Sequence, residues 1–269
     1  MLRNPQKAKD ALVSWIRTYM NADGGEETHR VAVLGLSGGK DSTVAAALCA
    51  EAIGKDRVCG LIMPQQVVGI SDAHRISSFL GINGEFHDIG DVVQSIERSF
   101  GFSKVALKSA MKANIPSRVR MVMLYTKAQE IGNARVVNTT NRSEKYLGWC
   151  SKFGDGAGDF APLADLLNHE VVQIGHALGI PEQWIEKEPA DGDLRVTDAE
   201  RWGFDYDVLD RYIDAQDREI DGYARDFIDA RHYATQHKYA PMPTFMVGAN
   251  NVERVAQYSA ADITNRWER

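Results

Sequence analysis

The sequence predicts an α/β protein with a doubly wound, mostly parallel sheet flanked by helices. Three short apolar segments have the composition of strands buried on both faces, 31–36, 57–63 and 134–139, and 85–89 is a weaker predicted strand. Helical segments separate these strands, and this alternation is typical of a parallel sheet with helices on both faces. In such sheets ligands lie beyond the carboxyl ends of the strands, so polar clusters at those ends are candidates for function.

The expected helices follow from apolar spacing and from start and stop signals. Asn4 and Pro5 form a helix start, and apolar residues follow at helical spacing up to Tyr19, with Trp15 expected in the core. Gly54, Gly81 and Gly179 each follow an apolar periodic segment, as glycines that end helices do. Further helices are expected at 43–53, 71–80, 91–100, 114–132, 168–178, 181–186, 206–213 and 219–230.

Length and composition predict a single domain. Its 269 residues divide into an N-terminal helix and loop (1–28), an α/β core (29–180) and a helical C-terminal part (181–269). The formal charge of −6 argues against a broad nucleic-acid surface, and we expect no nucleic-acid partner. No apolar segment is long enough for a signal peptide or a membrane span, and the three scattered cysteines are expected to be thiols, so we expect a cytoplasmic protein.

The segment Ser37–Ser42 is the strongest functional signal. Glycines interrupt the first strand just before a helix, where backbone N–H groups and the helix dipole form an anion site. Ser42 is expected to cap that helix. The spacing is neither that of a Walker A loop nor that of the dinucleotide fingerprint, because Asp41 follows Lys40 and the glycine pattern differs. A plain strand–helix turn with Asp41 beside the dipole is the alternative.

Other polar clusters follow later strands and helices. Arg118 and Arg120 are expected near a helix start, where cations are unfavourable unless anions approach them; a surface ion pair is the alternative. The block Thr139–Glu144 follows the last strand, and a capping box between Asn141 and Glu144 is its structural interpretation. The glycine-rich segment 148–159 is expected to be a mobile loop.

These blocks, taken together, resemble a known family. The segment Ser37–Ser42 is similar to the PP-loop of ATP pyrophosphatases, which cleave ATP between the α- and β-phosphates. With the segments 114–121, 139–144 and 152–156, and the pair His237–Lys238, the order of blocks resembles ammonia-dependent NAD synthetase. The resemblance covers about Val31 to Pro243 and implies an adenine-nucleotide hydrolase-like, Rossmann-like fold.

The resemblance also implies roles for individual residues. ATP would contact Gly35, Leu36, Ser37, Gly38, Gly39, Lys40, Asp41, Ser42, Met63 and Thr139. Deamido-NAD would contact Arg118, Lys152, Asp159, His237 and Lys238. Mg²⁺ would bind Asp41 and Glu144, and Asp41 and Lys187 would be catalytic. Ammonia, free or from another protein, would be the nitrogen donor, and the enzyme would be a homodimer with helices 5–20 and the helix from 115 as candidate interfaces.

Four positions depart from the family pattern, and we expect each to lose a polar contact: Asn138, Asn168, Ala190 and the pair Asp198–Ala199. Two alternatives therefore stay open. One is another PP-loop enzyme that adenylates a different substrate. The other is a nucleotide-binding homologue without catalysis.

Overall fold

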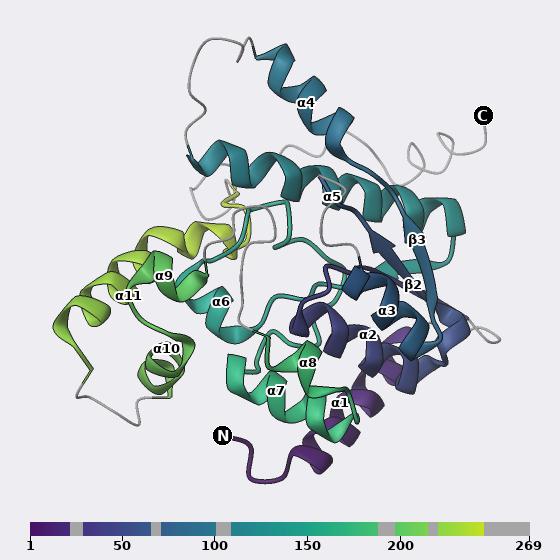
Figure 1. Cartoon of the computed structure of the whole chain (residues 1–269), viewed down its shortest axis with the longest axis horizontal. Coiled ribbons are helices and arrows are strands. Elements are labelled where there is room, and N and C mark those ends of the chain that lie inside the picture. Colours follow the sequence, from purple (N-terminus) through teal and green to yellow (C-terminus); the bar gives the residue numbers. More distant parts are fainter. Residues whose placement is uncertain (22–28, 66–70, 101–108, 188–196, 215–219, 245–269) are drawn as a thin grey trace, which may run out of the picture. The chain divides into compact units, whose positions relative to one another are not determined.

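The predicted parallel sheet is confirmed, and it has four strands in the described part of the chain. The computed structural model describes residues 1–21, 29–65, 71–100, 109–187, 197–214 and 220–244. The strands are β1 (Val31–Gly35), β2 (Val58–Ile62), β3 (Asn83–Phe86) and β4 (Ala134–Val136), in the order β3-β2-β1-β4 with every pair parallel (Figure 1). The last predicted strand is shorter than expected, because Val137 forms only an isolated bridge to Phe160.

Eleven α-helices are described, and most match the predicted segments. They are α1 (Pro5–Met20), α2 (Lys40–Ile53), α3 (Ser71–Leu80), α4 (Gly90–Ser99), α5 (Ser109–Ile131), α6 (Arg142–Leu147), α7 (Asn168–Ala177), α8 (Glu182–Ile185), α9 (Asp198–Trp202), α10 (Tyr206–Ile213) and α11 (Gly222–Thr235). Two 3₁₀ turns, Lys55–Arg57 and Gln236–Lys238, complete the set. Among these described helices, none combines the length and apolar character needed to cross a bilayer.

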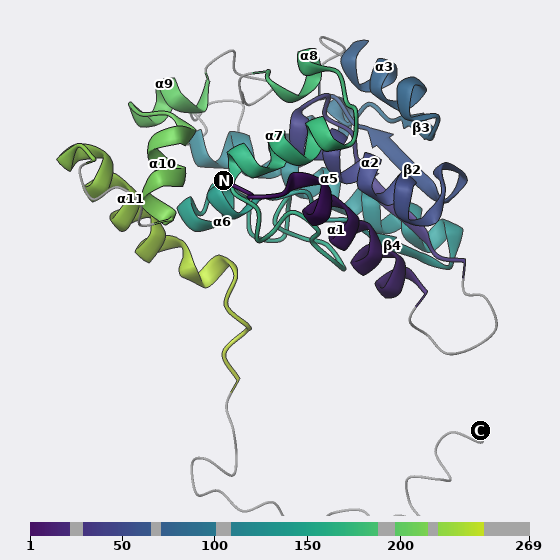
Figure 2. The ribbon, with the colours of Figure 1, turned by 90° about the horizontal axis from the view of Figure 1, so that it is seen from below.

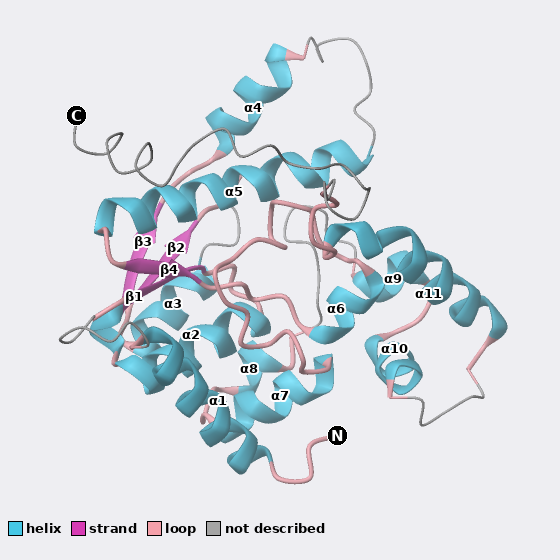
Figure 3. Ribbon diagram, turned by 180° about the vertical axis from the view of Figure 1, so that it is seen from behind, coloured by secondary structure: helices cyan, strands magenta, loops and turns pink. Residues whose placement is uncertain are grey.

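Helices cover both faces of the sheet. Figure 3 shows α5 on one side of the strands and α1 and α2 on the other. Alternating side chains of β1 face these two layers: Ala32 and Leu34 join the core with α1, α2 and α7, whereas Val33 joins the core with α5. Burial on both faces is the reason that β1 reads as a continuous apolar segment.

A third apolar cluster lies beyond the sheet. It consists of side chains from α6, α9, α10 and α11 around the fully buried Trp202, and these helices lie together in Figure 2. By contacts the chain separates into Met1–Tyr239 and Ala240–Arg269. All the elements above belong to the first unit, and the single-domain organisation stays a prediction.

Three local expectations are wrong. The helix expected from 114 begins at Ser109 and contains Pro116, so Arg118 and Arg120 lie well inside α5 and not at its start. Trp15 is 47% exposed and stacks on Tyr19 at the surface. Ser42 lies within α2, whose N-cap is Gly39.

Candidate functional site

The candidate site lies at the point where the direction of the sheet reverses. From β1 the chain adds β2 and then β3 on one side, and it adds β4 on the other side of β1. The loops that leave adjacent parallel strands at such a point diverge and leave a crevice. The loops after β1 and β4 carry the segments Ser37–Ser42 and Thr139–Glu144, so the fold brings these two predicted blocks to one place.

The loop after β1 is held by its own hydroxyl groups. Ser42 Oγ donates to the carbonyl of Gly39 at 3.0 Å and accepts from the backbone N–H of Ser37 at 3.3 Å. Ser37 Oγ accepts from the N–H of Gly39 at 3.2 Å. Thr43 Oγ1 also donates to Gly39 O, at 2.8 Å. Ser42 therefore stabilises the turn from inside the helix, although it is not the cap.

The turn requires glycine at Gly38. Its φ of +84° is a conformation that residues with a side chain rarely adopt. A Cβ added there would also lie 3.2 Å from Asp72 Cβ, so the chain is crowded at this point.

Asp41 lies in the first turn of α2 and is held from two sides. Its Oδ2 accepts from Lys40 Nζ at 2.9 Å, and its Oδ1 accepts from Asn141 Nδ2 at 3.0 Å. The second bond joins the two loops of the crevice directly.

Glu144 completes a carboxylate pair with Asp41. The predicted capping box is confirmed: Asn141 Oδ1 accepts from Glu144 N at 2.9 Å, and Glu144 Oε2 accepts from Asn141 N at 3.0 Å. Burial raises the pKa of Glu144 well above its usual range, and the charge of Asp41 raises it further. The structural and functional interpretations of Glu144 are thus compatible, since the box holds this carboxylate near Asp41. Carboxylate oxygens are the ligands that Mg²⁺ prefers, so the pair fits that ion.

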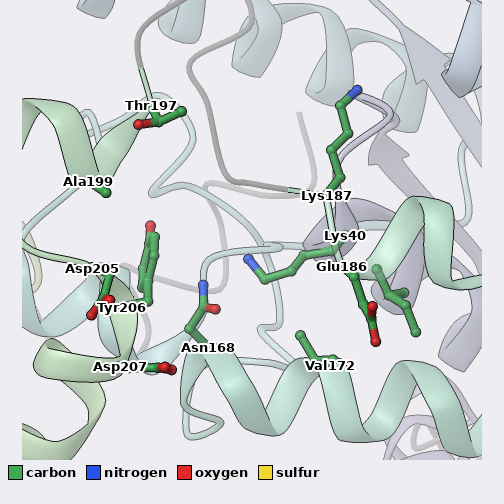
Figure 4. A pocket seen from close by; sticks show the side chains of 11 residues that line it. Lys40, Asn168, Val172, Glu186, Lys187, Thr197, Ala199, Asp205, Tyr206 and Asp207 are labelled. Carbon is green, nitrogen blue, oxygen red and sulfur yellow. The ribbon is translucent and has the colours of Figure 1, made fainter.

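A pocket of about 370 Å³ adjoins this cluster, and both Lys40 and Lys187 line it (Figure 4). Lys187 Nζ donates to Asp72 Oδ2 on α3 at 3.1 Å. The remaining lining residues come from α7, α8, α9, α10 and the residues that cap these helices, and they include Asn168, Thr197, Ala199 and Tyr206. The site thus continues from the glycine turn towards the helical part of the chain.

Four of the positions predicted to hold the dinucleotide are brought together: Arg118, Lys152, His237 and Lys238. Arg118 Nε donates to the carbonyl of Lys152 at 3.2 Å, and Lys152 Nζ donates to the carbonyl of His237 at 2.7 Å. Lys238 Nζ donates to the carbonyls of Gly148 and Cys150 at 2.7 and 2.6 Å. These contacts join α5, the loop after α6 and the 3₁₀ turn that follows α11.

Other predicted residues lie at the sheet. Asp159 accepts from the N–H of Val136 at 2.7 Å through Oδ2 and from Tyr125 at 3.4 Å through Oδ1, so it is bonded to β4 and α5. Met63 is buried beyond the end of β2, and its carbonyl accepts from Arg120 Nε at 3.1 Å. Gly35 ends β1, Leu36 is buried just after it, and Thr139 is partly buried in the loop after β4.

The departures from the family pattern have different consequences. The expectation that Asn138 loses a contact is wrong: Nδ2 donates to the carbonyls of Asp155 and Ala157, and Oδ1 accepts from Thr140 N. Asn168 is buried, and its Nδ2 has no hydrogen-bond partner within the described residues. Asp198 accepts from Trp149 Nε1 and from the hydroxyl of Tyr206. Ala199 lines the pocket, and Ala190 lies outside the described residues.

The loop expected to be mobile is anchored along its middle. Asp155 Oδ1 accepts from Ser117 Oγ at 2.9 Å and from the N–H of Ser151, and the N–H of Asp155 donates back to Ser117. A Cβ on Gly154 would lie within 2.4 Å of Ser117 Oγ, so this glycine permits close packing on α5.

The sequence prediction misses two site residues. It gives Asn141 only the role of a helix cap, although the spacing to Glu144 is the available signal for more. It treats Asp198 as a departure, yet this residue is buried beside the site and bonded to Tyr206.

Comparison with known proteins gives consistent matches. The family model described as NAD synthase matches residues 9–239. An NH(3)-dependent NAD(+) synthetase from Pyrococcus furiosus is 36% identical over 212 residues, which is 78% of each chain. One from Archaeoglobus fulgidus is 36% identical over 219 residues, 78% of this chain and 83% of that one.

Solved structures agree on the fold. The NMN synthetase from Francisella tularensis has a TM-score of 0.79 at 30% identity, covering 90% of this chain and 99% of that one. The NH3-dependent NAD synthetase from Campylobacter jejuni has a TM-score of 0.72, covering 91% and 100%, and its 24% identity shows the fold alone.

Proposed function

Because the chain belongs to the NAD synthase family, we propose that its site converts deamido-NAD to NAD with ATP and ammonia. The carboxylate of deamido-NAD attacks the α-phosphorus of ATP, and pyrophosphate leaves. Ammonia then attacks the carbonyl carbon of the acyl adenylate, AMP leaves, and the lost proton passes to solvent. The observation that carries this proposal is the meeting of Asp41, Asn141 and Glu144 beside the glycine turn after β1.

Asp41 and Glu144 would hold Mg²⁺. Their hard oxygen ligands fit the ion, and Asn141 holds both carboxylates: its side-chain amide donates to Asp41 Oδ1, and its backbone N–H donates to Glu144 Oε2. A bound Mg²⁺ offsets the repulsion between the carboxylate of the substrate and the phosphates of ATP.

The chain's own residues would position both substrates. The turn Ser37–Gly39 and the N-terminus of α2 present backbone N–H groups to phosphate oxygens, as anion sites of this geometry do. Lys187, beside the same pocket, would place positive charge near the reacting phosphate. Arg118 and Lys152 would contact the anionic dinucleotide from the other side.

Incubation of the purified protein with deamido-NAD, ATP, Mg²⁺ and ammonium tests the reaction. We expect equal amounts of NAD and AMP. Formation of ADP, or no NAD at any ammonium concentration, would contradict the proposal. A parallel reaction with glutamine shows whether the chain depends on free ammonia. Asp41→Ala should abolish turnover, while Asp56→Ala, an exposed acidic residue of the turn after α2, should not.

A second substrate follows from one comparison. The similarity to an NMN synthetase favours the mononucleotide analogue of deamido-NAD as an alternative acceptor of ammonia. Competition between the two nicotinate compounds at equal concentration, with both amides measured, gives the ratio of kcat/KM. A ratio above one for the mononucleotide would reassign the substrate and leave the adenylation chemistry unchanged.

A homodimer is the proposed assembly. The two predicted interface helices both contact Asp159, which is bonded to the edge strand β4. Tyr19 of α1 and Tyr125 of α5 both donate to Asp159 there, at 3.1 and 3.4 Å. Val122 of α5 is 55% exposed, and Trp15 of α1 is exposed on the other helix. Sedimentation equilibrium at assay concentration should give twice the mass of 29.8 kDa, and a monomer would contradict this assembly.

A further inference from the structure

Lys40 occupies an unusual position for a lysine. It is the first residue of α2 and only 5% exposed. A buried ammonium loses its hydration, and at a helix N-terminus it also meets the positive end of the dipole. Both effects are unfavourable, so the position requires strong anionic partners.

Carboxylates provide those partners. Lys40 Nζ lies 2.9 Å from Asp41 Oδ2, and the Asp41 side chain is only 18% exposed. A lysine side chain is ordinarily protonated at neutral pH, so this contact is an ion pair. Nζ also lies 5.5 Å from the centre of the Tyr206 ring. The ammonium is therefore a fixed charge inside the site.

The Lys40 ammonium group contacts the carboxylate of Asp41, which would bind the metal. With Asn141 on Oδ1 and Lys40 on Oδ2, both oxygens of Asp41 already accept hydrogen bonds. A divalent cation that approaches alone meets a neighbouring ammonium, and the repulsion is weakly screened because the site is partly buried. A cation that arrives with the phosphates of ATP brings compensating negative charge. The phosphates of ATP therefore make binding of the cation at Asp41 more favourable.

The structure also offers Lys40 a second place. Its side chain borders the pocket of about 370 Å³, whose wall includes Asp205 and Asp207 (Figure 4). On leaving Asp41, the amine would turn into this space. The acidic wall would stabilise the charge after the move.

We propose that Lys40 is a positioning residue that occupies Asp41 in the absence of nucleotide and thereby makes binding of a divalent cation depend on the phosphates of ATP. The proposal rests on the proposed function, because it takes Asp41 and Glu144 as the metal ligands. It goes beyond that function in assigning an order: metal enters with the nucleotide and not before it.

Calorimetric titration of the full-length protein with Mn²⁺ tests this order, with and without an ATP analogue that has a methylene group between the α- and β-phosphates. The variant Lys40→Met removes the charge and keeps the length of the side chain. We expect it to bind Mn²⁺ at least about tenfold more tightly than wild type without nucleotide. The difference should be much smaller with the analogue, and Lys40→Arg should behave like wild type.

Lys9→Met is the matched control. Lys9 is also buried and also paired with a carboxylate, Glu51, but it lies on α1 away from the site. The Lys9→Met variant should bind Mn²⁺ with the affinity of wild type. Should Lys40→Met fail to fold by circular dichroism, Lys40→Gln replaces it, because Gln keeps a donor for Asp41 without the charge.

Two outcomes overturn the proposal in distinguishable ways. If wild type with the analogue binds Mn²⁺ and the uncharged variant shows unchanged or weaker affinity without nucleotide, Lys40 has no such role. If no sample binds Mn²⁺ even with the analogue, the metal assignment itself fails. The NAD assay decides the reaction separately, since the titration needs no turnover.

Discussion

Asn141 Nδ2 lies 3.0 Å from Asp41 Oδ1, and these two residues are 100 positions apart in the chain. The same side chain accepts from the N–H of Glu144 through Oδ1. One amide therefore caps α6 and holds the carboxylate at the start of α2. The relative position of the two proposed metal ligands depends on it.

Replacing Asn141 by Ala should impair both stability and catalysis. Loss of the cap should lower the free energy of unfolding by about 1–2 kcal/mol. Loss of the bond to Asp41 should lower kcat roughly ten- to hundredfold, as for residues that orient metal ligands. Urea denaturation and initial rates of NAD formation measure the two effects.

Asn4→Ala is the control for this variant. Asn4 is the N-cap of α1, and its side chain accepts from Lys7 N at 2.9 Å. The Asn4→Ala variant should lose a similar amount of the free energy of unfolding, and its kcat should be unchanged. An Asn141→Ala enzyme with wild-type kcat would show that Asp41 does not need this partner.

Gly38→Ala should separate backbone strain from nucleotide binding. Its φ of +84° predicts a cost of roughly 1–2 kcal/mol in the free energy of unfolding. Gly54 has a φ of +88°, but a Cβ added there would meet open space, whereas a Cβ on Gly38 is also crowded by Asp72, so Gly54→Ala should lose an equal or smaller amount of folding free energy. Only Gly38→Ala should lose ATP affinity, because only that turn faces the phosphates. Equal ATP affinity for both variants by calorimetry would contradict the phosphate site.

Much of the fold follows from local patterns. The segments around β1 and β2 are continuous apolar runs because helices cover both faces, and burial of this kind is visible in composition. The polar blocks at 37–42 and 139–144 follow adjacent strands, so their meeting also follows once the sheet is assumed parallel. For the same reason the pairing of Asp41 with Glu144 could be predicted from the amino-acid sequence.

Other features depend on contacts that no local pattern encodes. Pro116 favours a helix start near 114, because a proline inside a helix removes one backbone hydrogen bond, yet α5 continues through it. The exposure of Trp15 depends on what packs against α1 and not on spacing alone. The pairing of Lys40 with Asp41 requires knowledge of its burial and its neighbours.

Arg118→Met should weaken binding of the nicotinate substrate. The guanidinium lies beside Lys152 on the side of the site expected to meet the anionic dinucleotide. We expect the KM for deamido-NAD to rise about tenfold with kcat less changed, because the lost contact is present in ground state and transition state alike. The KM for ATP should stay constant. Arg98→Met, at the exposed end of α4, should leave both constants unchanged. A rise in the KM for ATP alone would move Arg118 to the nucleotide side.

Glu85 should give the protein a pH-dependent stability away from the site. Burial alone would raise the pKa of Glu85, but hydrogen bonds from Lys127, at 3.0 Å, and from Asn83 outweigh it and lower that pKa. A lowered pKa means that the unfolded chain binds more protons, so this stability is present above pH ~4.5 and is lost as the pH falls through the lowered value.

Glu85→Gln should therefore lower the free energy of unfolding by about 1 kcal/mol at pH 7, with the difference shrinking below pH ~4. Glu130→Gln is the matched control, since Glu130 bonds to the same Lys127 but is 69% exposed. Exposed ion pairs contribute little, so its effect should be smaller at every pH. Urea denaturation of the three proteins at pH 7 and pH 4 measures these differences. An equal loss for Glu85→Gln at both pH values would mean that the carboxylate charge is not the source of the stability, and that the amide fails for reasons of packing.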